Sequence, residues 1–253
     1  MIVKNNGYSN KPWSAIQKAS TDLGKTEDGR YHVDGFRWDI VNNADGSAQE
    51  LGVFGDAYIK PEGVKDVYLG IVPFVDKPGG YPGHAQLHFE MQPDSPVTDG
   101  KGNSDHGLVV SVEVHFKQGE FWDPVEEKDQ PTLYQVCSWN DAIEKATVFH
   151  HDPIQLYKLD LTQQQKETLL RERLDAALLD HTQDVYHPTT NSCLSTLVEA
   201  VNKVTPSSQN IPKGAPNSTV PVWSPKAFKK YHLIDSTTPD QIIPAQPKPG
   251  QSA

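Results

Sequence analysis

The chain has 253 residues, a formal net charge of −10 and 36% hydrophobic residues, with 20 prolines and 18 glycines. This length allows one large domain or two small ones with a core that needs no covalent cross-links, and the prolines and glycines predict a loop-rich fold. The basic residues are dispersed, which argues against a nucleic-acid partner or electrostatic docking on anionic lipid, because both need clustered lysine and arginine.

Residues 1–30 are polar, and we expect them to form a lead-in that carries no chemistry. The first residues lack the apolar stretch of a secretory signal, and no segment reaches the roughly 18 apolar residues that a membrane span requires. The sequence therefore predicts a soluble chain with no transmembrane segment.

Alternating segments predict two strands between residues 31 and 74, at 31–41 and 66–74, separated by turns rich in Asn, Asp, Gly and Pro. Two further strands, at 84–91 and 108–116, are joined by a long polar loop. Side chains alternate along a strand, so each of these two has one polar face, made of His84, Gln86, His88 and Glu90 in the first and of Ser111, Glu113 and His115 in the second. If the strands pair in register, the two polar faces meet.

A short strand is predicted at 155–159, followed by a helix whose start is marked by Thr162 and Gln165 in capping-box spacing. The buried stripe of this helix consists of Leu169, Leu170, Leu174, Ala177 and Leu178.

A second helix is expected from Cys193 to about Val204, and a short one at 225–231. The remaining segment, 236–253, is rich in proline and too poor in apolar residues to order itself. We therefore predict a lead-in at 1–30, one domain at 31–235 and a disordered tail at 236–253.

Cys193 is the most informative single residue, because it falls where a loop gives way to an apolar helix. In the first turn of a helix, the dipole and the free N–H groups favour a thiolate and lower the pKa of the thiol from its ordinary value of about 8.5. The alternative is structural, since Cys193, Leu197 and Val201 recur every four residues as a core stripe would, and a lone cysteine is often a small buried filler.

The chain has only two cysteines, Cys137 and Cys193. Two are too few for a disulfide scaffold, a zinc site or an iron–sulfur cluster. A single disulfide between them stays open at this point, and it would exclude thiol chemistry at Cys193.

A cysteine nucleophile requires a base within hydrogen-bond reach and a third group that orients the base. His84, at the start of a strand, is the candidate base, and His88 on the same face is the fallback. Glu113 on the neighbouring strand can accept the second ring N–H. The structural alternatives are a polar strand histidine that faces water and a solvated carboxylate.

Metal binding is not favoured, although His150, His151 and Asp152 are adjacent, as are Asp105 and His106. Neighbouring strand residues point to opposite sides, and no second cluster has ligand spacing. No pair of carboxylates stands out as a glycosidase pair either. We expect no metal and no cofactor.

Several segments together resemble a known family. They are Gly35 to Asp39, Tyr58 with Val67 to Leu69, Gly83 to Phe89, Ser111 to Glu120, Leu156 to Leu159, Tyr186 to Cys193 and Trp223 to Leu233. Their order is similar to that of the Lnb N-terminal periplasmic domain family. The resemblance implies an α+β fold of the circularly permuted papain-like (NlpC-type) class, in which an antiparallel sheet with the His and Glu strands packs on the Cys-bearing helix.

The resemblance also implies roles for individual residues. Cys193 would be the nucleophile, His84 the base and then the acid, Glu113 the orienting group and Tyr186 a hydrogen-bond donor to the oxyanion. Further substrate contacts are expected at Asn191, Ser192, His88 and His115. Two positions depart from the family pattern, because Ser192 stands where an Asn is expected and His115 where an Arg is expected.

The implied activity is acyl transfer or hydrolysis through a thioester, on a phospholipid or lipoprotein acyl group at a bacterial envelope. The implied location is periplasmic or secreted. A cysteine peptidase or amidase acting on a peptide or peptidoglycan is an alternative, and a secreted effector is one form that it could take. A binding module that keeps the fold without catalysis is the alternative from another class, and it predicts an ordinary, unreactive thiol.

Overall fold

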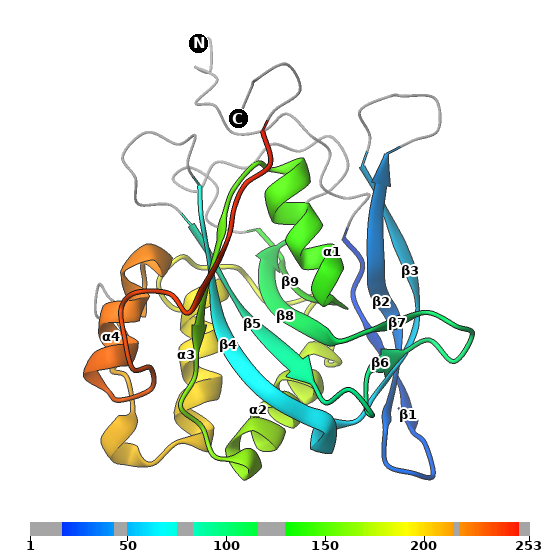
Figure 1. The fold of residues 1–253 in the computed structure, drawn as a ribbon, viewed down its shortest axis with the longest axis horizontal. Helices are drawn as coiled ribbons and strands as arrows, with labels where there is room; N and C mark the ends of the chain where they lie inside the picture. The colour runs from blue at the N-terminus through cyan, green and yellow to red at the C-terminus, as the bar shows by residue number, and fades with distance from the viewer. Residues whose placement is uncertain (1–16, 43–49, 75–82, 116–129, 215–217, 248–253) are drawn as a thin grey trace.

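The computed structural model describes residues 17–42, 50–74, 83–115, 130–214 and 218–247. Within these residues one twisted sheet runs through the molecule, with helices on both of its faces (Figure 1). The α+β class predicted from the sequence is therefore confirmed.

The sheet has the strand order β11-β10-β4-β5-β8-β9-β2-β3-β6-β7, and β1 pairs with β2. Its strands are β1 (Thr21–Lys25), β2 (Tyr31–Asn42), β3 (Glu50–Ile59), β4 (Val64–Pro73), β5 (Gly83–Met91), β6 (Val97–Thr98), β7 (Ser104–Asp105), β8 (Gly107–Val114), β9 (Thr132–Ser138), β10 (Ile154–Lys158) and β11 (Gln241–Ile243). The described pairs are antiparallel except for β2 and β9, which are parallel and meet where Arg37 faces Cys137. The sheet is thus nearly, but not wholly, antiparallel.

The five predicted strands correspond to β2, β4, β5, β8 and β10. Sequence reading missed the long strand β3, which contains two glycines, and β9, which fills the space between β8 and β2. It also placed Phe116 in a strand, but Phe116 lies outside the described residues.

Strands also form in both segments that were expected to lie outside the domain. β1 lies within residues 1–30 and pairs with β2, and β11 lies within the predicted tail and pairs with β10, with Ile243 opposite Ile154. All five residues of β1 are exposed. Main-chain hydrogen bonding along an existing strand can order such a segment without burying an apolar face, which hydrophobic periodicity does not detect.

The polar faces of β5 and β8 do meet, as predicted. The strands pair with Gln86 opposite Ser111 and His88 opposite Val109. Continued by two residues, this register places His84 opposite Glu113. The pairing of the two strands therefore brings together two of the residues expected in the site.

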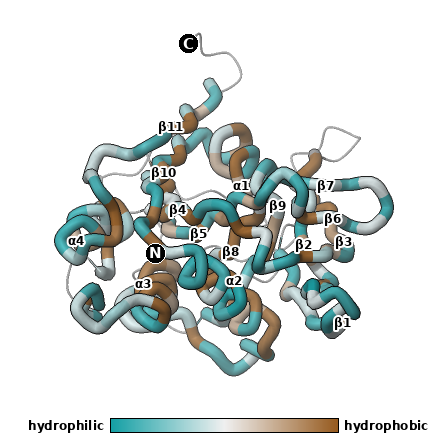
Figure 2. The backbone as a smooth tube through the Cα atoms, turned by 60° about the horizontal axis from the view of Figure 1, so that its bottom comes forward, coloured by the Kyte–Doolittle hydropathy of each residue, from teal (hydrophilic) through white to brown (hydrophobic). Residues whose placement is uncertain are grey.

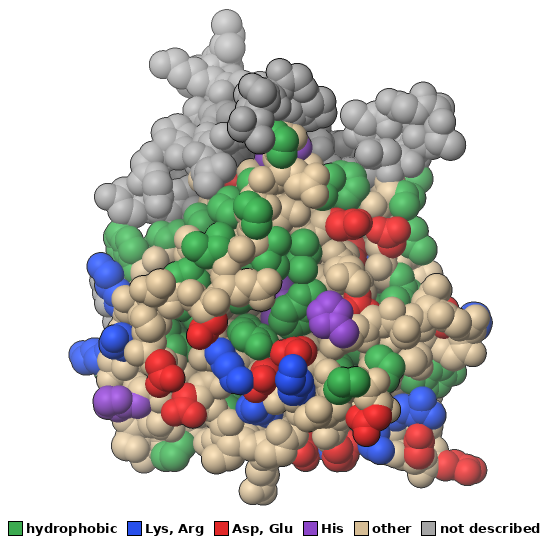
Figure 3. Space-filling model, viewed as in Figure 1, with side chains coloured by type: hydrophobic (Ala, Val, Ile, Leu, Met, Phe, Trp, Pro, Cys, Tyr) green, Lys and Arg blue, Asp and Glu red, His purple; other side chains and the backbone are tan. Residues whose placement is uncertain are grey.

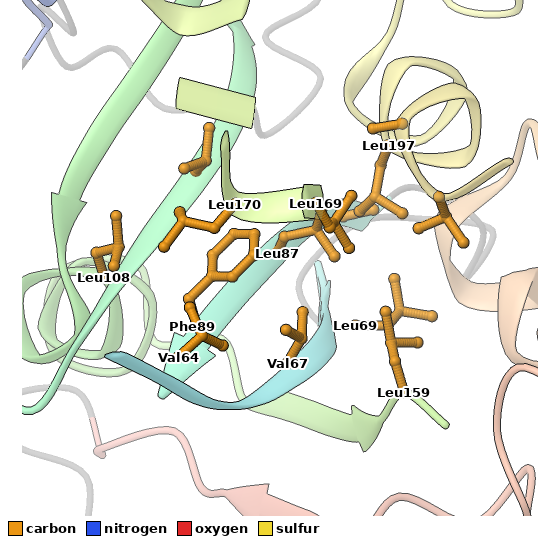
Figure 4. Close-up of a cluster of buried hydrophobic side chains, with 14 of the residues drawn as sticks. Val64, Val67, Leu69, Leu87, Phe89, Leu108, Leu159, Leu169, Leu170 and Leu197 are labelled. Carbon is orange, nitrogen blue, oxygen red and sulfur yellow. The ribbon is translucent and has the colours of Figure 1, made fainter. Parts of the chain in front are cut away.

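One face of the sheet is covered by α2 (Gln163–Ala177) and α3 (Cys193–Val204). The predicted capping box of Thr162 and Gln165 begins α2. The contact is apolar, with Leu169 and Leu170 facing side chains of β4 and β5 (Figure 4). α3 is hydrophobic along much of its length and lies beside the same strands (Figure 2). This side holds the main hydrophobic core, and α4 (Ser224–Lys230) contributes Ala227 and Phe228 to it.

The other face is covered by α1 (Trp139–Glu144), which continues at once as η3 (Lys145–Phe149), a π-helical segment. Here the sheet presents charged and polar side chains. Arg37 on β2 donates to both carboxylate oxygens of Asp141 on α1, and the two side chains are 1% and 0% exposed. A buried ion pair thus joins α1 to the sheet.

Three 3₁₀ segments, η2 (Pro61–Gly63), η4 (Ser207–Gln209) and η6 (Pro221–Trp223), complete the described elements. None of the helices in the described part of the chain combines the length and apolar character needed to cross a membrane. Acidic and basic side chains are interspersed over the lower part of the α1 side (Figure 3).

Candidate active site

Cys193 is the first residue of α3, and the local sequence fixes it there. Ser192 is the N-cap: its hydroxyl accepts a hydrogen bond from the Ser195 N–H, while the Ser192 N–H donates to the Ser195 hydroxyl at 2.7 Å. This reciprocal capping box satisfies two of the unpaired groups at the helix start. The thiol therefore lies in the first turn of α3, with its side chain largely buried at 6% exposure.

His84 is the second residue of β5, beside the sulfur of Cys193. The strand begins with Gly83, where an added Cβ would lie 3.1 Å from Val222 and from the Val72 carbonyl oxygen. The absence of a side chain at Gly83 therefore lets η6 approach the start of β5. This close packing positions His84 at the edge of the site.

The surroundings of Cys193 lower the pKa of its thiol from the ordinary value. Burial alone would raise the pKa, but the charge and N–H of His84, the Ala85 backbone N–H and the Tyr186 hydroxyl together outweigh it. These groups favour the thiolate, the form of cysteine that acts as a nucleophile.

Tyr186 contacts the thiol from a loop that is anchored to the start of β9. Its hydroxyl donates to the Cys193 sulfur at 3.9 Å, and its backbone N–H donates to the Gln130 carbonyl. The Tyr186 oxygen is also close to the Cys193 backbone N–H. Burial and the neighbouring sulfur raise the pKa of Tyr186 well above its ordinary value, so the phenol keeps its proton and can donate.

Glu113 lies near His84, but its hydrogen bonds go elsewhere. Its Oε1 accepts from Lys145 Nζ at 2.7 Å and from the Ser111 hydroxyl at 3.1 Å, and Gln17 approaches Oε2 at 3.4 Å. The Nε2 of His84 is buried and has no hydrogen-bond partner among the residues that the structure describes. The structure thus places Glu113 beside His84 without the hydrogen bond expected of an orienting group.

The ionised form of Glu113 is strongly favoured. Burial acts to raise its pKa, but the positive charges of Lys145, His84 and Arg37 outweigh burial and hold the pKa well below its ordinary value. Glu113 therefore acts on His84 as a fixed negative charge.

Two of the expected substrate contacts make structural hydrogen bonds. Ser192 is buried as the helix cap. The Asn191 side chain donates to the Val185 carbonyl at 2.8 Å and to the Thr132 hydroxyl at 3.3 Å, which ties the Tyr186 loop to β9. Both residues therefore have a structural role in the site, and their contact with a substrate stays a prediction.

The two remaining histidines lie in opposite environments. His88 is fully buried against Trp139, and Gly70 leaves room for its ring, since an added Cβ there would lie 2.6 Å from it. Burial, with smaller contributions from His84 and His106, lowers the pKa of His88 to about 3, so the ring is neutral. His115 is exposed just beyond β8. Of these two histidines, His88 is thus enclosed in the interior and His115 is exposed.

Lys145 and Gln17 were not anticipated from the sequence. Lys145 is four residues after Asp141, so both can lie on one face of a helix, but nothing marks the segment 139–144 as a helix that covers a polar sheet face. Gln17 comes from the N-terminal lead-in and also donates to the Val114 carbonyl at 2.8 Å. Both contacts are long-range in sequence, and no local pattern signals them.

Cys137 and Cys193 are both free thiols. Cys137 packs with Val109 and Ala142, whereas Cys193 belongs to the main core cluster. Burial raises the pKa of Cys137 well above its ordinary value. We therefore expect Cys137 to be the less reactive of the two thiols. Within the described segments no group of three or more His, Cys, Asp or Glu side chains could hold a metal ion.

A separate cleft of about 390 Å³ lies near the start of α1. Its lining includes Trp38, Asp39, Asp105 and Glu144. None of the residues predicted for catalysis lines it, so the chemistry of the thiol has to be argued from its own neighbours.

The fold and this site define an α+β protein in which an ionisable thiol, an imidazole and a phenol meet at the start of one helix. The family model for the Lnb N-terminal periplasmic domain matches residues 54–226, which is more than half of the chain. The protein belongs to that family. Neither the curated proteins nor the solved structures give a match.

Proposed function

We propose that this protein is a thiol acyltransferase or hydrolase that works through a thioester on Cys193. The observation that carries the proposal is the surroundings of the thiol: His84, the Ala85 N–H and the Tyr186 hydroxyl overcome the effect of burial and lower its pKa. A cysteine kept only as filler in a core has no need of such neighbours.

In the first half-reaction, the Cys193 thiolate attacks an acyl carbonyl carbon, a C–S bond forms, and the carbonyl electron pair moves to oxygen. The Cys193 N–H and the Tyr186 hydroxyl, which lie close together, would donate to this oxyanion. The intermediate collapses to the thioester as the bond to the leaving group breaks, and His84 gives that group its proton.

In the second half-reaction, an amine or water attacks the thioester, and His84 takes its proton. The C–S bond then breaks, which returns Cys193 as the thiolate and releases an amide or an acid. The lack of a partner for His84 Nε2 among the described residues is compatible with this scheme, because catalytic contacts often tighten only with substrate.

For the substrate we propose an acyl ester of a phospholipid or lipoprotein in the bacterial envelope, reached by a periplasmic or secreted protein. This part of the proposal follows from the family, whose domain is described as periplasmic. The circularly permuted papain-like arrangement is part of the same proposal. It is supported by the order of His84, Glu113 and Cys193 in the chain and by the packing of α3 on the apolar side of β5 and β8.

The acyl-enzyme can be detected directly. Protein in a Cys137→Ser background, incubated with a phospholipid of defined acyl chain, should gain the mass of one acyl group on Cys193, removable by hydroxylamine. Cys193→Ser and His84→Ala in the same background should gain none. A parallel incubation with a peptidoglycan peptide or a peptide amide tests the amidase alternative.

A binding module without catalysis is the second candidate, and the observation that favours it is the burial of Cys193 at 6% exposure. It predicts no acyl-enzyme with either class of substrate. It also predicts that iodoacetamide labels Cys193 at the same rate with and without His84.

A further inference from the structure

The ion pair between Lys145 and Glu113 lies near His84, the proposed base. Lys145 Nζ is 2.7 Å from Glu113 Oε1, and the side chains are only 16% and 12% exposed. Two charges are costly to remove from water, and their mutual attraction offsets that cost only in good geometry. A buried pair next to a candidate catalytic histidine therefore calls for a functional as well as a structural explanation.

The backbone is irregular at the same residue. α1 ends at Glu144, and Lys145 begins the π-helical segment η3, in which the His150 N–H donates to the Lys145 carbonyl at 3.1 Å. Such widened turns are rare and occur frequently at functional sites. The irregular backbone and the buried ion pair thus coincide at Lys145.

Attachment of α1 to the sheet does not by itself require Lys145. One turn earlier, Asp141 accepts hydrogen bonds from Arg37 at 2.8 and 3.0 Å in a fully buried pair. That contact already joins the same helix to the sheet. A second ion pair adds a further effect, a fixed pair of opposite charges beside His84.

We propose that Lys145 is a positioning residue that holds Glu113 as an ionised carboxylate beside His84 and so sets the pH at which the Cys193–His84 pair loses its first proton. This inference rests on the proposed function of Cys193 and His84. The charged and titratable groups around Glu113 and His84 come from six elements: His84 and His88 on β5, Cys193 on α3, Arg37 on β2, Asp141 on α1, Lys145 on η3 and Tyr186 on its loop.

The direction of the effect follows from Coulomb's law. A nearby positive charge favours loss of a proton, whereas a nearby negative charge opposes it. Removing the charge of Lys145 should therefore raise the pH at which the pair first ionises, and removing the charge of Glu113 should lower it. A role limited to docking α1 predicts instead that both changes act alike, because either one breaks the same contact.

The test measures the rate of iodoacetamide alkylation of Cys193 against pH, in a Cys137→Ser background. Lys145→Met should move the midpoint up by about half a pH unit and Glu113→Gln should move it down by a similar amount. Lys145→Arg, which keeps the charge, should stay close to the parent. Lys145→Gln provides a second neutral variant if Lys145→Met does not fold.

Lys166→Met is the matched control. Lys166 Nζ lies 2.8 Å from Asp66 Oδ1, and the two side chains are 13% and 11% exposed. The substitution therefore removes a comparably buried lysine from an ion pair that is not part of the site. It should lower the melting temperature without moving the alkylation midpoint.

Midpoint shifts of the same sign for Lys145→Met and Glu113→Gln, or no shift in either, would overturn the role of Lys145 if His84→Ala still abolishes low-pH alkylation. Alkylation of the parent that is unaffected by His84→Ala would instead overturn the proposed function, and the inference with it. The two failures thus give different patterns.

Discussion

The two faces of the sheet differ in what they bury. The face under α2 and α3 holds the main apolar cluster, with Leu169 and Leu170 packed on β4 and β5. The face under α1 holds smaller apolar clusters beside two buried ion pairs, Arg37–Asp141 and Lys145–Glu113. Cys193 comes from the apolar side, and His84 comes from the polar face of β5, which it shares with Gln86 and His88. The apolar face thus supplies the helix start that carries the thiol, and in our proposal the charged face supplies groups that set its ionisation.

The largest effect on stability is expected from breaking the Arg37–Asp141 pair. Arg37→Met would leave Asp141 buried without a partner, and one-sided loss of a buried pair costs about 3 to 5 kcal/mol of unfolding free energy. Urea unfolding measures it. Lys158→Met, which removes a half-exposed lysine from Asp66, should cost less than about 1 kcal/mol. Equal losses of unfolding free energy in the two variants would mean that the buried Arg37–Asp141 pair is no more important for stability than an exposed pair.

On the apolar face, Leu169→Ala should cost about 3 kcal/mol, because a fully buried leucine leaves a cavity when truncated. The two faces differ in what else changes. Leu169→Ala should leave the pH dependence of Cys193 alkylation as in the parent at temperatures where the variant is folded. A shift in that profile would show that the apolar face also controls the ionisation of the thiol.

His88 connects the charged face to the pH dependence of folding. Its pKa of about 3 in the folded protein is below the ordinary value of 6.5, so the unfolded chain binds the proton more readily. The contribution of His88 to stability is therefore complete above pH 6.5 and is lost as pH falls from 6.5 towards 3. Its slope is about 1.4 kcal/mol per pH unit.

Urea unfolding between pH 6.5 and 5 should accordingly show a smaller loss for His88→Gln than for the parent. His106 also contacts Trp139 but is half exposed, so His106→Gln is the control and should keep the parental slope. An unchanged slope in His88→Gln would mean that His88 is not held neutral in the interior.

The smallest effect is expected at the start of α3. Ser192→Ala removes one half of a capping box and should cost about 1 kcal/mol. Thr162→Ala makes the same change in α2 at a similar cost. Only Ser192→Ala should also slow alkylation of Cys193, since it alone loosens the turn that carries the thiol. Equal alkylation rates in both variants would mean that the Ser192 cap does not affect the reactivity of Cys193.

The sequence predicts the apolar face better than the charged one. The helix at Cys193, the capping box of Thr162 and the alternation in β5 and β8 are local patterns with periods that a single chain displays. They suffice to bring His84 and Glu113 together, whereas the approach of Cys193 to them was implied by the family resemblance. The proximity of Tyr186 to the sulfur was implied by the family resemblance rather than by any local pattern.

The charged face could not be derived in the same way. Arg37 and Asp141 are 104 residues apart, and Glu113 and Lys145 are 32 apart. A charged residue carries no local mark of a distant partner, and most such residues are solvent-exposed. For the same reason His88 and Glu113 were placed on the correct face of their strands, but the burial of His88 and the bond of Glu113 to Lys145 appear only in the folded protein.

The most direct measurement is the pH dependence of Cys193 alkylation by iodoacetamide in Cys137→Ser protein, compared with Cys137→Ser/His84→Ala. If His84 lowers the pKa of the thiol, the first protein should be labelled readily at about pH 6 and the second only as the pH approaches about 8.5. Labelling that begins near pH 8.5 in both proteins would contradict a nucleophilic Cys193 and leave the protein as a binding module.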